Sequence, residues 1–213
     1  MEIKGAIFDL DGTLLDSMGA WDSVATKYLE NKGIKASDTL ENEIKSMSLE
    51  EACQYMKEQY KLEESADAIL KGILKIVESF YINRAELKQG VEAFLQALYK
   101  KGVKMCVATA TNKAFAEAAL DRNNVLDLFE TIITCSEYGC AKRTADIYNI
   151  ALDVLGTEKK GTVVFEDAYH AAKSAKDGGF VVCGVYDESE DEAVEDICDF
   201  YIKSFTEAGE YFD

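Results

Sequence analysis

The sequence alternates between short apolar runs and longer segments with helical spacing. The first run, residues 3–8, is apolar and β-compatible, as a buried parallel strand would be. Apolar residues then recur every three or four positions, as at Val91, Phe94 and Leu98. This alternation predicts an α/β fold: a doubly wound, mostly parallel sheet with helices on both faces and a ligand site at the carboxyl ends of its strands. Later strands are expected at residues 103–109, 131–134, 162–165 and 180–185, with a weaker edge strand at 200–203.

The segment from Ser17 to Leu87 departs from this alternation because it is helical throughout. An apolar stripe that begins at Trp21, a capping box at residues 48–51 and an apolar helix face over residues 69–77 predict three helices. A helical insertion directly after the first strand is expected to lie over the strand ends as a lid. We therefore predict a core domain made of residues 1–16 and 88–213 and a small α-helical cap domain made of residues 17–87.

Two carboxylates follow the first strand at a glycine turn, in the run Asp9-Leu10-Asp11-Gly12-Thr13. Asp9 closes the strand, and Gly12 lets the chain turn sharply, so that Asp11 is re-aimed at the same pocket. A carboxylate that attacks phosphorus must be held rigidly beside a cation, and a strand end supplies the rigidity. Asp11 would protonate the leaving oxygen and later deprotonate water. The pattern predicts a phosphoryl-transfer site.

Two further polar clusters follow later apolar runs. Thr109 ends the strand at residues 103–109, and its hydroxyl with the backbone N–H of Ala110 would hold phosphate oxygens. The alternative is that this segment only caps a helix that starts near Lys113. Lys142 lies in a loop before another helix, where it would neutralise nucleophile and phosphate or would simply be solvated.

Glu166 and Asp167 directly follow three apolar residues, where the strand should still be half buried. Two adjacent acids are poorly explained there as a solvated surface. Mg²⁺ typically takes one or two carboxylates and keeps several waters. We predict that Asp9, the Asp11 carbonyl and Asp167 bind Mg²⁺, with Glu166 at or beside the metal.

The order of these clusters resembles the four motifs of the haloacid dehalogenase superfamily, and the helical insertion is similar to the cap of its β-phosphoglucomutase-like phosphatases. The resemblance implies a Rossmann-like core and an Mg²⁺-dependent hydrolase of phosphoric monoesters that forms an aspartyl-phosphate intermediate. Two motifs depart from the family pattern: the loop Lys142-Arg143-Thr144-Ala145-Asp146 lacks the usual prolines, and Ala168 and Ala171 replace a serine and a glycine. The residues that carry the resemblance are Asp9, Asp11, Gly12 and Thr13, then Thr109, Lys142, Glu166 and Asp167. By the same resemblance Asp9 is the nucleophile, Asp11 the acid/base, Thr109 and Lys142 the phosphate holders, and Asp167 the metal ligand with Glu166 beside it.

Three functions remain open at this point. The first is a phosphatase acting on a small phosphomonoester, and the second is a phosphomutase or a carbon–halogen hydrolase. The third is a phosphate-accepting receiver module, which is not an enzyme. Halide displacement needs no proton donor such as Asp11, and receivers lack a helical insertion after their first strand. His170 is the sole histidine and has no nucleophile elbow nearby, which argues against Ser-His-Asp or Cys-His chemistry.

The composition of the chain narrows the classes of molecule that it can bind. The chain has 213 residues, of which 23 are Lys or Arg and 40 are Asp or Glu, giving a formal net charge of -17. This charge argues against nucleic acid or an anionic membrane as a partner, and no apolar segment approaches the roughly 20 residues of a membrane span. The six cysteines include no Cys-x-x-Cys pair and are expected to be core thiols. We expect a cytoplasmic monomer that acts on a small phosphorylated metabolite.

Overall fold

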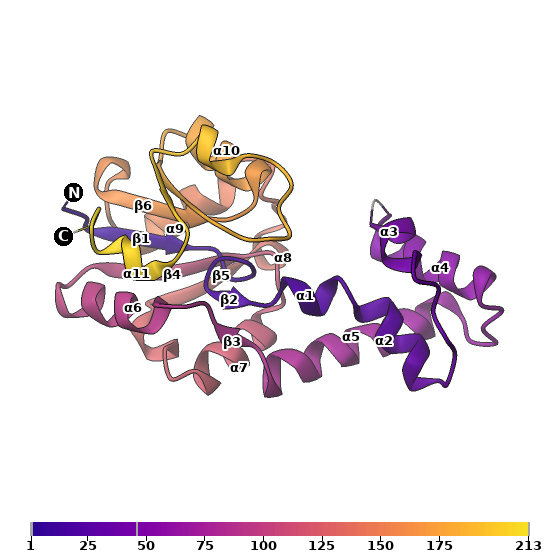
Figure 1. The fold of residues 1–213 in the computed structure, drawn as a ribbon. Helices are drawn as coiled ribbons and strands as arrows, with labels where there is room; N and C mark the ends of the chain where they lie inside the picture. The colour runs from indigo at the N-terminus through magenta and orange to yellow at the C-terminus, as the bar shows by residue number, and fades with distance from the viewer. Residues whose placement is uncertain (1, 46, 213) are drawn as a thin grey trace. The chain divides into compact units, whose positions relative to one another are not determined.

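The computed structural model describes residues 2–45 and 47–212. Met1 and Asp213 of the predicted core domain and Ser46 of the predicted cap domain lie outside the described residues. The chain divides into two compact units (Figure 1), which are described separately below. We call them the core unit, made of Met1–Ser17 and Ala85–Asp213, and the helical unit, made of Met18–Arg84.

The core unit contains a six-stranded sheet in which every neighbouring pair is parallel, in the order β5-β4-β1-β6-β7-β8. Figure 1 shows β1 between β4 and β6. The predicted α/β fold is therefore confirmed. The carboxyl ends of β4 and β6 lie on either side of the carboxyl end of β1. The strands are β1 (Gly5–Phe8), β4 (Lys104–Thr109), β5 (Thr131–Thr134), β6 (Thr162–Glu166), β7 (Val181–Val185) and β8 (Phe200–Ile202).

Helices connect these strands and cover the sheet. The helix α9 contacts β1, β4 and β5, α10 contacts β6 and β7, and α6 contacts β4. The core helices are α6 (Val91–Lys100), α7 (Lys113–Arg122), α8 (Cys135–Tyr138), α9 (Asp146–Leu155), α10 (Tyr169–Asp177) and α11 (Phe205–Ala208), with short 3₁₀ turns η1 (Leu126–Leu128), η2 (Lys159–Gly161) and η3 (Val194–Asp196).

One face of the sheet is aliphatic and packs against α9 and α10. Ile7, Val164 and Val182 from three strands are fully buried in one cluster with Ile147 and Ala172 from the two helices. Because side chains alternate along a strand, the residues that follow Ile7 and Val164 point to the opposite face.

That opposite face is aromatic. The rings of Phe8 and Phe165 stack with centroids 4.6 Å apart, and Phe94 of α6 meets Phe165 edge-on. Phe205 and Phe212 complete the cluster from the C-terminal segment, which the sequence patterns did not predict as part of the core. The residues just before Asp9 and Glu166 are thus anchored in the densest aromatic packing of the core unit.

The helical unit packs around one long helix. Ile69, Ile73 and Val77 of α5 are buried along one stripe, and α2 and α4 contact this helix. The predicted capping box is present, because Ser48 and Glu51 exchange both capping hydrogen bonds. The helices are α1 (Met18–Trp21), α2 (Val24–Asn31), α3 (Leu40–Ile44), α4 (Leu49–Gln59) and α5 (Ala66–Asn83).

The first predicted helix of this unit is divided into α1 and α2. The Ser23 hydroxyl donates to the Gly19 carbonyl at 2.7 Å, a local bond that competes with a continuous helix. The indole N–H of Trp21 donates to the Tyr81 hydroxyl at 3.0 Å, so the Trp21 ring is fixed against α5 inside its own unit.

Two very short strands join the ends of the two chain segments of the core unit. β2 (Leu15–Asp16) pairs antiparallel with β3 (Glu86–Leu87), and the Lys88 N–H donates to the Leu14 carbonyl at 2.9 Å. This pairing draws Ala85 and the two β3 residues into the core unit, whereas the sequence analysis began its second segment at residue 88. Among the described residues, none of the helices combines the length and apolar character needed to span a membrane.

The aromatic face generates a stability prediction. Phe165 is fully buried, so Phe165→Ala should lower the free energy of unfolding by roughly 3–5 kcal/mol through lost burial and the cavity left behind. Tyr99→Ala is the matched control, because Tyr99 is 58% exposed and its truncation should change stability by less than about 0.5 kcal/mol. Urea unfolding followed by circular dichroism measures both. Equal losses in the two variants would contradict the packing described here.

Candidate active site

The loop after β1 is a tight turn that only glycine can complete. Asp9 continues the strand pairing, since its N–H donates to the Phe165 carbonyl at 3.0 Å. Gly12 has a φ of 75°, and a Cβ at this position would collide with the Asp167 carboxylate. The turn therefore brings the backbone of the first motif directly against the acid that follows β6.

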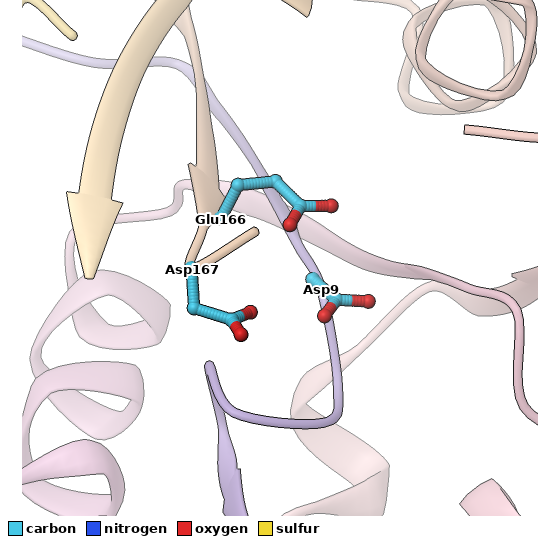
Figure 2. Close-up of side chains that lie close together, drawn as sticks. All are labelled: Asp9, Glu166 and Asp167. Carbon is cyan, nitrogen blue, oxygen red and sulfur yellow. The ribbon is translucent and has the colours of Figure 1, made fainter. Parts of the chain in front are cut away.

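Three buried carboxylates converge at this edge of the sheet. Asp9, Glu166 and Asp167 each offer an oxygen, and these oxygens all lie within 4.8 Å of one another (Figure 2). They form the single group of this kind found in the part of the chain that the structure describes. Like charges this close and this buried need a cation or protons between them.

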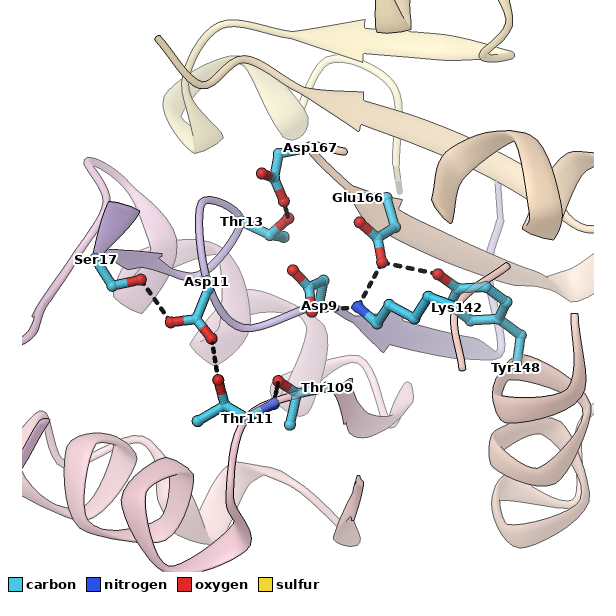
Figure 3. A network of polar contacts seen from close by, with 10 residues as sticks. All are labelled: Asp9, Asp11, Thr13, Ser17, Thr109, Thr111, Lys142, Tyr148, Glu166 and Asp167. Carbon is cyan, nitrogen blue, oxygen red and sulfur yellow. Dashed lines mark hydrogen bonds and ion pairs between the residues drawn. The ribbon is translucent and has the colours of Figure 1, made fainter. Parts of the chain in front are cut away.

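Lys142 is the cation that the chain itself supplies. Its ammonium forms an ion pair with Asp9 and a second one with Glu166 Oε1 at 2.6 Å (Figure 3), and its side chain is only 8% exposed. The buried Tyr148 hydroxyl donates to the same Glu166 oxygen at 2.8 Å. Glu166 Oε2, in contrast, is buried and has no hydrogen-bond partner, the one such side-chain atom among the described residues.

The proton affinities of these groups show that one lysine does not balance three acids. Burial raises the pKa of Asp9 well above its usual range against the opposing charge of Lys142, and the charges of Glu166 and Asp167 raise it further. Burial and the charge of Glu166 raise the pKa of Asp167 to about 7, although the Thr13 hydroxyl and Lys142 oppose this. Burial would lower the pKa of Lys142, but the charges of Asp9 and Glu166 outweigh it and raise the pKa. The site is short of positive charge.

The donor set suits a hard divalent cation. All three acids present oxygen, Glu166 Oε2 is left without a partner, and Thr13 fixes Asp167 by donating to its Oδ1 at 2.7 Å. Asp9, Asp167 and Glu166 are therefore the residues that fit Mg²⁺ by chemistry, charge and burial.

Hydroxyl groups hold Asp11 at the rim of this cluster. Its two carboxylate oxygens accept hydrogen bonds from Ser17 and from Thr111, each at 2.6 Å. The buried Thr109 hydroxyl accepts the Thr111 N–H at 2.9 Å, which leaves its own hydrogen available for a ligand. Ala110 is exposed in the turn directly after β4.

The segment after β4 also caps the helix α7, as the alternative interpretation predicts. Asn112, not Thr109, caps the helix α7, because the Asn112 side chain accepts the Ala114 N–H. All the predicted site residues thus lie on the loops at the carboxyl ends of β1, β4 and β6, or reach them, as Lys142 does, from the loop before α9. His170 lies on α10 and is exposed.

The sequence did not indicate which groups hold the acids in place, although Thr13 belongs to the first motif. Thr13, Ser17 and Thr111 donate to the carboxylates, and only their nearness to the acidic motif or the second cluster could have indicated this. Tyr148 lies in an apolar helical stripe, so its hydroxyl gave no signal.

Lys88 was missed as well, because its partners are distant in sequence. Its ammonium donates to the carbonyls of Gly12 and Tyr186, both at 2.6 Å, and to the Asp187 carboxylate at 2.9 Å. One half-buried side chain therefore ties the loop after β1, the end of β3 and the loop after β7 together.

Comparison with known proteins agrees with this geometry. The model of the family described as "Haloacid dehalogenase-like hydrolase" matches residues 6–185, most of the chain. The chain belongs to the haloacid dehalogenase-like hydrolase family. This membership identifies a hydrolase and confirms the family resemblance, whereas a receiver module, which is not an enzyme, does not fit it.

Two curated relatives of this haloacid dehalogenase-like hydrolase match along most of their length. The "Phosphorylated carbohydrates phosphatase" of Thermotoga maritima is 23% identical over 83% of this chain and 82% of its own. The "Validoxylamine A 7'-phosphate phosphatase" of Streptomyces hygroscopicus subsp. limoneus is 25% identical over 96% and 95%.

Solved structures show the same fold. A Thermotoga maritima protein matches with a TM-score of 0.86 at 22% identity, covering 96% of both chains. The structure of CbbY from Rhodobacter sphaeroides in complex with phosphate matches with a TM-score of 0.77 at 18% identity, covering 97% of this chain and 96% of that one. At these identities the likeness establishes the architecture alone.

The Lys88 contacts generate a second stability prediction. Lys88→Met keeps the aliphatic stem but leaves two carbonyls and the buried Asp187 carboxylate without this donor, which should lower the free energy of unfolding by roughly 1–3 kcal/mol. The control is Lys71→Met, which removes an ion pair with Asp67 that is 70% exposed on both sides and should leave stability nearly unchanged. Thermal and urea unfolding of both variants give the comparison, and a Lys88→Met protein as stable as the control would show that the contacts are not needed.

Proposed function

We propose that this protein is an Mg²⁺-dependent phosphatase that hydrolyses a small phosphomonoester through an aspartyl-phosphate intermediate. The observation that carries the proposal is the cluster of three buried carboxylates, two of which pair with one buried lysine, with Asp11 two residues after Asp9. Relatives named as phosphatases of phosphorylated carbohydrates, of validoxylamine A 7'-phosphate and of hexitol support sugar and polyol phosphates as the first substrate class to test.

Asp9 is the proposed nucleophile. One of its carboxylate oxygens forms a bond to phosphorus while the bond from phosphorus to the leaving oxygen breaks, and Asp11 gives its proton to that oxygen. Asp11, now a carboxylate, then takes a proton from water, which attacks phosphorus, frees Asp9 and releases inorganic phosphate. The ion pair with Lys142 fixes the direction of the Asp9 carboxylate during both steps.

The proposed metal ligands are the carboxylates of Asp9 and Asp167 and the carbonyl of Asp11, with Glu166 Oε2 at or beside the metal. Bound Mg²⁺ would offset the charge of the acids and of the phosphate and polarise a phosphoryl oxygen. Thr13 holds Asp167 in a single orientation for this purpose.

Lys142 and Thr109 are the proposed holders of the transferring phosphoryl group, together with the backbone N–H of Ala110. The Lys142 ammonium already lies at Asp9, and the Thr109 hydroxyl has a hydrogen to donate. Donors that are fixed before reaction stabilise charge that develops on phosphoryl oxygens.

Hydrolysis is favoured over phosphoryl transfer between two sugar hydroxyls. A mutase must bind a second phosphate, which calls for a basic residue. At the start of α4 the helical unit carries Leu49, Glu50 and Glu51, and the last two are exposed acids. Three points stay predictions from the sequence. They are that the helical unit is a cap, that the protein is cytoplasmic and that it is a monomer.

The proposal is tested by a screen of phosphorylated sugars, polyols and other metabolites with Mg²⁺ present and with chelator. We expect release of inorganic phosphate that requires the metal. β-Glucose 1-phosphate with a trace of the 1,6-bisphosphate is included, and faster formation of glucose 6-phosphate than of phosphate would replace the phosphatase by a mutase. Turnover that is unchanged by chelator would refute the metal dependence.

Asp9→Asn should reduce turnover by at least about 10³-fold, because an amide is nearly isosteric with the carboxylate but does not attack phosphorus. The matched control is Asp16→Asn, an exposed acid of the same loop region, which should retain the wild-type rate. Both rates are measured with an aryl phosphate after circular dichroism shows that the proteins are folded. A wild-type rate in the Asp9→Asn variant would show that Asp9 is not the nucleophile.

Asp11→Asn should distinguish substrates by their leaving group. Its amide oxygen still accepts a hydroxyl, but it supplies no proton, so alkyl phosphates should lose about 10²- to 10⁴-fold in rate. Activated aryl phosphates leave without full protonation and should lose less in the phosphorylation step. Single-turnover rates over a series of leaving groups measure this, and equal losses across the series would contradict the acid role of Asp11.

A further inference from the structure

Two cysteines meet at the end of the short helix α8, in the loop that leads to Lys142. The helix ends at Gly139, whose φ is 62°, and the N–H of Gly139 and that of Cys140 both donate to the Cys135 carbonyl, the latter at 3.1 Å. This closure is a Schellman-type motif, in which the first residue of the last turn and the second residue after the helix bring their side chains into contact. Here those residues are Cys135 and Cys140, and both pack against the same aliphatic cluster of the core unit.

This pair is more exposed than three of the other four cysteines. Cys53, Cys106 and Cys183 are fully buried, whereas Cys135 and Cys140 are partly exposed. The residues on both sides of Cys140, Gly139 and Ala141, are exposed to solvent. A small solute therefore has access to the pair. Cys198 is also partly exposed, on the loop before β8, and serves below as a control.

The pair is also coupled to the active site. Cys140 precedes Lys142 by two residues, and the Lys142 ammonium lies against Asp9 and Glu166. Cys135 directly follows Thr134, the last residue of β5, which pairs with Thr109 at the end of β4, so Cys135 lies at the same edge of the sheet as the site. The chain has no proline, so the loop from Cys140 to Lys142 has no rigid ring to isolate one from the other.

We propose that Cys135 and Cys140 are an oxidative modification site, whose reversible disulfide displaces Lys142 and slows hydrolysis. With hydrogen peroxide as oxidant, one thiolate attacks a peroxide oxygen, the O–O bond breaks, and a sulfenic acid and water form. The second sulfur then attacks the sulfenic sulfur and expels the second water. Two thiols and one peroxide give one disulfide and two waters, and a dithiol reductant reverses the reaction.

The order of the two sulfurs follows from burial. Cys140 lies between two exposed residues, so Cys140 is oxidised first and Cys135 resolves the intermediate. Formation of the bond brings the two sulfurs to covalent distance, and the backbone that carries Lys142 must shift with them. A shift of about 1 Å in a catalytic group can cost about 10²-fold in rate.

Trypsin offers a direct test, because cleavage after Arg122 and Lys142 releases residues 123–142 as one peptide with both cysteines and no other. The intact protein is treated with hydrogen peroxide, free thiols are alkylated, and the peptide is weighed by mass spectrometry while activity is measured in parallel. We expect this peptide to be lighter by two hydrogen atoms and unalkylated, and the rate to fall by at least about tenfold and to recover with dithiothreitol.

The variants Cys135→Ala and Cys140→Ala should hydrolyse substrate at the rate of the reduced wild-type protein and should not be inactivated by peroxide. Cys198→Ala should still be inactivated by peroxide. A peptide 123–142 that keeps two alkylated thiols after peroxide has inactivated the enzyme would overturn the proposal, as would a disulfide that leaves the rate unchanged. The effect on rate rests on the proposed function, but the disulfide does not. If the reduced protein hydrolyses no phosphoester, the proposed function fails while the mass of the peptide still decides whether the site exists.

Discussion

The structure depends on one electrostatic constraint: three carboxylates are buried at the ends of two adjacent strands, and a single buried lysine pairs with only two of them. Asp9, Glu166 and Asp167 lie within 4.8 Å of each other, and the pKa values of Asp9 and Asp167 are raised chiefly by burial. Such an arrangement opposes folding unless other contacts hold it. The stacked rings of Phe8 and Phe165, one residue before Asp9 and Glu166, provide that anchorage. The same deficit of positive charge favours binding of a metal ion, and the charges of that ion and of Lys142 would in turn attract a phosphate group.

Hydrogen-bond donors around the site hold each acid in a different position. Thr13 orients Asp167, Tyr148 and Lys142 share one oxygen of Glu166, and hydroxyls hold Asp11 at the rim. Acids with the same chemistry are thereby separated into a nucleophile, a proton donor and metal ligands in the proposed mechanism. Lys142 joins two of the acids, so any change in its loop reaches the nucleophile, which is why the Cys135 and Cys140 pair matters.

Much of the sheet and its acidic edge could be predicted from the sequence, because strand ends, glycine turns and adjacent acids are local signals. The strands expected at residues 131–134 and 180–185 are observed at Thr131–Thr134 and Val181–Val185. The missed features depend on contacts between distant segments. Phe205 and Phe212 join the core through rings contributed by other elements, and Lys88 finds its partners on loops after β1 and β7. The break between α1 and α2 follows from one Ser23 hydrogen bond that apolar spacing does not show.

The central claim is that Asp9 carries the phosphoryl group during turnover. It is tested most directly by mixing excess enzyme with a hydrolysable sugar phosphate, quenching within the first turnover, reducing the acyl phosphate with borohydride and sequencing the peptides by mass spectrometry. The account predicts that position 9 is converted to homoserine, and that the conversion disappears without substrate. Turnover with an unmodified Asp9 and a modified residue elsewhere, or with no modified residue at all, would contradict it.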